Sequence, residues 1–122
     1  MGKMKWRPAP DELVRIFTEA VAAYLPGAQL RKMFGYPAAF FNGNMFAGLH
    51  QENMILRLSE SDRARLLMHD ESAPFEPMPG RIMKEYVTVP PSIYDDPVKL
   101  KQWLNNSYVY AQSLPPKKPK KA

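Results

Sequence analysis

Apolar residues near the start of the chain recur with the spacing of a helix that buries one face. They follow the i, i+3, i+4, i+7 pattern and comprise Leu13, Ile16, Phe17, Ala20, Val21 and Tyr24. Pro10 suits the first turn of such a helix, and Pro26-Gly27 ends it. The pattern predicts an amphipathic helix over about residues 10–25, whose apolar face has a structural role.

The next apolar stretch, residues 31–58, changes to the two-residue period of strands. It contains Asn42-Gly43, the strongest short hairpin signal, because both central residues of a type I′ turn need positive φ. We expect three short antiparallel strands here. The first runs from about residue 31 to Phe41, the second covers about 45–50, and the third covers about 53–58.

The remaining elements have recognisable ends. Ser59 is a candidate N-cap for a helix that continues to about residue 69. Prolines then interrupt residues 72–80, so any strand there is brief or lies at an edge. Residues 81–89 alternate as a strand, and Asp96-Pro97 marks the start of a last helix that ends near Leu114.

Composition adds limits to this picture. The chain has 122 residues and 45% apolar residues, which suits a single domain with one core. It contains no cysteine, which excludes disulfides, zinc–thiolate sites and thiol nucleophiles. No apolar run approaches membrane-spanning length and no signal peptide is recognisable. We therefore expect a cytoplasmic protein that makes no membrane contact.

The net charge of +5 is concentrated at the two ends of the chain, and residues 8–114 carry a net charge of −2. This divides the chain into a flexible basic N-terminus (1–9), one domain (10–114) and a disordered Pro/Lys tail (115–122). Basic tails of this kind are more often solubilising, or they bind nucleic acid weakly and without sequence preference. The candidate contacts are Lys3, Lys5, Arg7, Lys117, Lys118, Lys120 and Lys121.

Catalytic patterns are missing from the sequence. It contains no phosphate-binding loop, no dinucleotide fingerprint and no His-Glu-x-x-His motif. The only histidines, His50 and His69, have no spacing that brings them together, so we expect no metal, no cofactor and no catalytic residues. The eight methionines either fill gaps in the core or line an adaptable binding surface.

One polar set remains as a candidate binding site. Its members lie on or beside strands, where they either contact an anionic partner or are simply solvated: Arg57, Arg81, Lys84 and Tyr86.

Several short motifs, in order, resemble the N-terminal domain of the TfoX/Sxy family of bacterial competence regulators. The first group is Arg31-Lys32-Met33-Phe34-Gly35, Phe40, Asn42-Gly43 and Met45-Phe46-Ala47. The second is Pro79-Gly80-Arg81-Ile82-Met83-Lys84-Glu85-Tyr86-Val87, Val89-Pro90, Asp95-Asp96-Pro97, Trp103-Leu104 and Ser113-Leu114-Pro115-Pro116-Lys117-Lys118. Together they cover about residues 10–118.

The resemblance implies an α+β, secretion-chaperone-like two-layer fold of order α-β-β-β-α-β-β-α. Its antiparallel sheet would carry helices on one face. We expect a stand-alone domain that lacks the family's C-terminal helical domain and supplies no catalytic residues to carry over.

Three functions compete. The first is a non-enzymatic regulatory or protein-interaction module, whose partner is another protein or a second copy in a homodimer. The second is a weakly nucleic-acid-associated factor in competence or transcription, acting through the basic tails. The third is a small-ligand-binding protein or enzyme with an unrecognised pocket.

Overall fold

The computed structural model describes residues 7–117 and folds into two layers. Its helices are α1 (Asp11–Tyr24), α2 (Glu60–Leu66), α3 (Pro91–Tyr94) and α4 (Pro97–Ser113). Its strands are β1 (Gln29–Met33), β2 (Tyr36–Phe41), β3 (Asn44–His50), β4 (Asn53–Arg57), β5 (Pro74–Met78) and β6 (Arg81–Val89).

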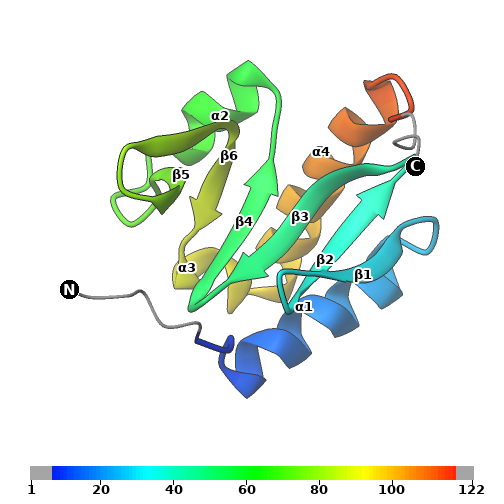
Figure 1. Cartoon of the computed structure of the whole chain (residues 1–122), viewed down its shortest axis with the longest axis horizontal. Helices are drawn as coiled ribbons and strands as arrows, with labels where there is room; N and C mark the ends of the chain where they lie inside the picture. Colours follow the sequence, from blue (N-terminus) through cyan, green and yellow to red (C-terminus); the bar gives the residue numbers. More distant parts are fainter. Residues whose placement is uncertain (1–6, 118–122) are drawn as a thin grey trace.

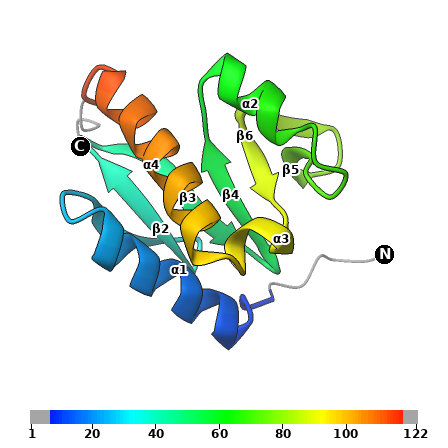
Figure 2. The same cartoon turned by 180° about the vertical axis from the view of Figure 1, so that it is seen from behind.

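All the strands join one antiparallel sheet in the order β1-β2-β3-β4-β6-β5. The helices lie together behind the sheet in Figure 1 and in front of it in Figure 2. The predicted α+β class, the antiparallel sheet and the placement of helices on one face are therefore confirmed.

The stretch expected to hold three strands holds four. Phe34 and Gly35 both adopt positive φ, 55° and 85°, and form a two-residue turn that splits the first expected strand into β1 and β2. The Asn42-Gly43 turn forms as predicted, with φ of 51° and 81°. Positive φ is unusual for an aromatic residue, which is why Phe34 gives no turn signal in the sequence.

The helix ends agree well with the sequence. The Ser59 hydroxyl accepts a hydrogen bond from the Asp62 N–H at 3.3 Å, although α2 stops at Leu66, before the expected position 69. Asp96 caps α4 by accepting from the N–H groups of Val98 and Lys99 at 3.0 and 3.3 Å. The short helix α3 after Pro90 was not predicted.

The main core lies between the sheet and the helices. Phe17 from α1, Phe46 from β3 and Leu104 from α4 are each fully buried there. A bulge in the β2–β3 ladder places Phe46 and Ala47 both toward the helices, since Ala39 pairs with Ala47 while the next residue, Phe40, pairs with Met45. Ser107 of α4 is the buried polar residue of this core, and its hydroxyl lies 2.7 Å from the carbonyl oxygens of both Phe46 and Arg57.

Candidate functional site

Strand β6 bends sharply, and the bend organises the polar residues around it. Pro74 of β5 pairs with Val87, but the next residue, Phe75, pairs with Met83, so residues 84–86 of β6 have no partner in β5. Beyond the bend, residues 86–89 pair with β4 on one side, while Val87 still pairs with Pro74 of β5 on the other. A bulge of this kind turns side chains away from their normal alternation.

Glu85, within the bend, joins β4 to α4. Its carboxylate accepts a hydrogen bond from the Arg57 Nε at 2.7 Å and from the Tyr110 hydroxyl at 3.0 Å. Burial, the largest single influence, raises the pKa of the Glu85 carboxyl, but the hydrogen bonds from Arg57 and Tyr110 bring it below its usual value. Glu85 is therefore ionised at neutral pH and neutralises Arg57.

Tyr86 turns the other way and crosses β4. Its hydroxyl donates to the carbonyl oxygen of Met45 in β3 at 2.8 Å, and the Arg57 guanidinium lies 5.8 Å from the centre of its ring. Burial raises the pKa of the Tyr86 phenol, so the group stays protonated and keeps donating. The structure thus brings together two of the predicted candidates, Arg57 and Tyr86.

The other two candidates, Arg81 and Lys84, lie on the exposed part of the β5–β6 hairpin and take no part in the hydrogen bonds of Glu85 and Tyr86. Among the described residues neither has an ion-pair partner. The same hairpin exposes three apolar side chains: Met78 is 48% exposed, Ile82 59% and Met83 36%. We call Met78, Arg81, Ile82, Met83 and Lys84 the hairpin surface.

The basic residues at the two ends of the domain lie far from each other. Arg7 forms an ion pair with Glu52 at 3.2 Å in the β3–β4 turn. The Lys117 N–H donates to the Asn42 carbonyl at 2.9 Å in the β2–β3 turn, at the opposite end of β3. The remaining candidates for nucleic-acid contact, Lys3, Lys5, Lys118, Lys120 and Lys121, lie outside the described residues, and their role stays a prediction.

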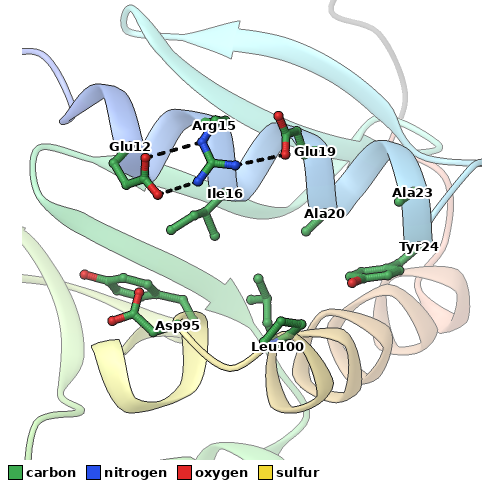
Figure 3. Close-up of a pocket in the computed structure, with 11 residues that line it drawn as sticks. Glu12, Arg15, Ile16, Glu19, Ala20, Ala23, Tyr24, Asp95 and Leu100 are labelled. Carbon is green, nitrogen blue, oxygen red and sulfur yellow. Dashed lines mark hydrogen bonds and ion pairs between the residues drawn. The ribbon is translucent and has the colours of Figure 1, made fainter.

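A groove of about 430 Å³ lies between α1 and the α3–α4 corner, as Figure 3 shows. Arg15 stands at its rim, paired with Glu12 and, at 3.1 Å, with Glu19. These three side chains satisfy one another, and Ile16 and Leu100 line the groove beneath them. The groove is therefore lined by both apolar and polar side chains and keeps an excess of negative charge at its rim, because two carboxylates share one guanidinium and Asp95 lies nearby. It does not hold a general acid or base close to a nucleophile.

The described part of the chain also contains no group of three or more His, Asp or Glu side chains placed to hold a metal ion. Within the same residues, no helix is both long and apolar enough to cross a membrane. The polar network at the β6 bend has an evident structural use, since it holds β4, β6 and α4 together.

Sequence reasoning missed Glu85 and Tyr110. Glu85 sits between Lys84 and Tyr86 in a strand-like run and carries no signal of its own. Tyr110 lies one residue from Ala111 of the buried stripe. The bend in β6 places the Glu85 carboxylate between Arg57 of β4 and Tyr110 of α4.

Comparison with known proteins places the fold in a family. The family model for the TfoX N-terminal domain matches residues 10–111, most of the chain. The chain belongs to the TfoX N-terminal domain family. The matched span includes all of the helices and strands except the last two residues of α4. A search of curated proteins returned no match. A search of solved structures returned none either.

Proposed function

We propose that this TfoX N-terminal domain is a non-enzymatic, regulatory protein-interaction module, and that the hairpin surface contacts its partner. The single observation that carries the proposal is the exposure of Met78, Ile82 and Met83 beside Arg81 and Lys84. The proposal includes a cytoplasmic location, which a chain without cysteine suits.

The composition of the hairpin surface supports a protein partner. Adjacent side chains of a strand point to opposite faces of the sheet, so when one face is buried they are seldom both exposed. Ile82 and Met83 are nevertheless 59% and 36% exposed. Methionine is common on binding surfaces because its flexible side chain adapts to a partner. Arg81 and Lys84 add two cations that form no ion pair among the described residues, so we expect the partner to offer an apolar surface edged by Asp and Glu.

The hairpin is also attached in a way that suits recognition. The Pro79-Gly80 turn projects at its tip, with Gly80 at a φ of 81° and no atom within 4 Å of the position its Cβ would take. The base of the hairpin is fixed by the bend at Glu85, through Arg57 and Tyr110. An exposed apolar tip on a fixed base loses little conformational entropy on binding.

Site-specific photo-crosslinking tests the proposal. A photoreactive amino acid at position 82 should give a discrete adduct in cells that express the whole chain. The same group at position 98, where Val98 of α4 is 67% exposed, serves as the matched control. The adduct should disappear when Arg81→Glu and Lys84→Glu are combined.

The mass of the adduct identifies the partner. An adduct of twice the chain mass indicates a second copy, and any other discrete mass indicates a different protein. Equal crosslinking from positions 82 and 98, an adduct that survives the double charge reversal, or no adduct at all would overturn the proposal.

A further inference from the structure

The two edges of the sheet differ in their capacity to accept another strand. The β5 edge contains Pro74 and Pro77, and Pro79 follows directly, so the edge lacks N–H groups at several points. The β1 edge, Gln29–Met33, contains no proline. Four of its five residues are exposed and the fifth is half-buried, and β1 is the terminal strand of the described sheet, paired with β2 alone.

The register of the β1–β2 hairpin shows which backbone groups face outward. Met33 pairs with Tyr36 across the two-residue Phe34-Gly35 turn, and residues flanking such a turn exchange both of their hydrogen bonds. Alternate residues of β1 therefore bond to β2, and the N–H and C=O groups of Leu30 and Lys32 point away from the sheet. Pro37, which has no N–H, stands opposite Lys32, as this alternation requires.

The side chains of β1 add a charge preference. Arg31 and Lys32 are adjacent, so they point to opposite faces of the sheet. The Arg31 guanidinium lies 4.1 Å from the centre of the Phe40 ring, and neither cation has an ion-pair partner among the described residues. Leu30 is 41% exposed and offers an apolar contact beside them. An added strand with two adjacent acidic residues would meet a cation on each face.

The same charges disfavour a second copy of this strand. The antiparallel register that pairs all five residues of β1 with another β1 places Arg31 opposite its own equivalent. Like charges directly opposite each other destabilise a pair of strands. Basic residues on edge strands are a recognised protection against self-association.

We propose that β1 is a docking site for an extended acidic segment of another protein, which adds to the sheet as an antiparallel strand. Leu30 and Lys32 supply the backbone hydrogen bonds, and Arg31 and Lys32 select acidic side chains. This surface is separate from the hairpin surface, so the inference does not depend on the proposed function.

A synthetic peptide tests the inference on the full chain. The probe is acetyl-Thr-Glu-Glu-Val-Thr-amide, which places Glu opposite Lys32 and Arg31 and Val opposite Leu30. In two-dimensional ¹H–¹⁵N NMR, the peptide should shift the amide signals of β1 and slow hydrogen exchange at Leu30 and Lys32. The amides of Gln29, Arg31 and Met33, already bonded to β2, should change much less. A peptide with two lysines in place of the glutamates should bind with an affinity at least about tenfold lower.

Two variants separate backbone from charge. Lys32→Thr removes the cation and keeps the N–H, whereas Lys32→Pro removes both, so Lys32→Pro should bind the acidic peptide more weakly than Lys32→Thr. Combining Arg31→Glu with Lys32→Glu should reverse the preference toward the lysine peptide, and this readout holds even if Lys32→Pro does not fold. Equal binding of both peptides, unchanged preference in the reversed variant, or no slowing at Leu30 and Lys32 would overturn the inference.

Discussion

The rings of His50 and Phe75 meet edge to face, with centroids 5.2 Å apart, although two strands lie between β3 and β5 in the sheet. Three strand spacings in a flat sheet would span about 14 Å. The bend in β6 therefore folds β5 back over the face of the sheet that carries no helix. There Phe75 is 5% exposed, and the Tyr36 ring lies on His50 with a centroid distance of 5.4 Å.

This packing makes the stability of the domain depend on pH. Burial lowers the pKa of the His50 imidazole below its usual 6.5, with Glu52 opposing the shift and Arg7 adding to it. The unfolded chain thus binds a proton more readily than the folded one, so stability is complete above about pH 7.5 and declines as the pH falls through 6.5. Urea unfolding between about pH 7.5 and 5.5 should show this decline.

His50→Phe should flatten this pH profile, because it removes the titrating group and keeps a ring between Tyr36 and Phe75. His69→Gln, at an exposed site after α2, should leave the profile as it is. A His50→Phe protein that retains the full decline would show that another group is responsible.

Ser107 makes a fully buried polar contact between α4 and the sheet. Its single hydroxyl proton is shared between the carbonyl oxygens of Phe46 and Arg57, each 2.7 Å away. Ser107→Ala should lower the free energy of unfolding by about 1–3 kcal/mol, since it leaves the two buried carbonyl oxygens without this hydrogen-bond donor. Ser113→Ala, which removes an exposed hydroxyl near the end of α4, should change it by less than about 0.5 kcal/mol. Chemical unfolding measures the stability of both variants, and an equal loss in the two would contradict the role given to the Ser107 hydroxyl.

The Arg57–Glu85 pair should be energetically coupled. A double-mutant cycle with Arg57→Met and Glu85→Gln should give a coupling free energy of about 1 kcal/mol, because the side chains are only 23% and 35% exposed. The coupling should decrease in 1 M salt. The exposed Arg65–Asp62 pair is the matched control and should show a smaller coupling. Stability that is unaffected by Glu85→Gln would remove the structural role assigned to the bend.

Two glycines with the same φ isolate the contact made by residues 115–117. Gly43 and Gly80 both have φ of 81°, but a Cβ at Gly43 would lie 3.1 Å from the Lys117 Cβ and carbonyl oxygen, and one at Gly80 meets nothing. Backbone strain should lower the free energy of unfolding by about 1 kcal/mol in both Gly→Ala variants. The contact with Lys117 should lower it further in Gly43→Ala. In thermal unfolding, the losses of stability in the two variants should become equal once residues 115–122 are removed. A persistent difference would place its cause elsewhere.

The sequence predicts elements whose signals are local. Asn42-Gly43, Ser59 and Asp96 each mark a turn or helix start through their own backbone chemistry, and each is found there. The Phe34-Gly35 turn escapes prediction because tertiary pairing of β1 with β2 imposes positive φ on an aromatic residue that disfavours it. Apolar alternation then continues through the turn and hides it.

The candidate site is predicted only in part, for a geometric reason. Arg57 and Tyr86 are recognised as polar residues on strands, and they do meet. Arg81 and Lys84 belong to the same strand as Tyr86, so sequence alone groups them together. The bend at residues 84–86 directs the first half of β6 away from β4. Residues 84–86 include no glycine or proline that would indicate this bend.

The prolines of β5 limit how far the sheet can grow. A strand bound at β1, as proposed above, would extend that edge, whereas Pro74 and Pro77 interrupt the row of N–H donors at the other edge. Growth through the sheet would therefore be confined to the β1 edge. Two open edges would let copies of the domain stack edge to edge into a continuous sheet, and the prolines of β5 oppose that kind of aggregation.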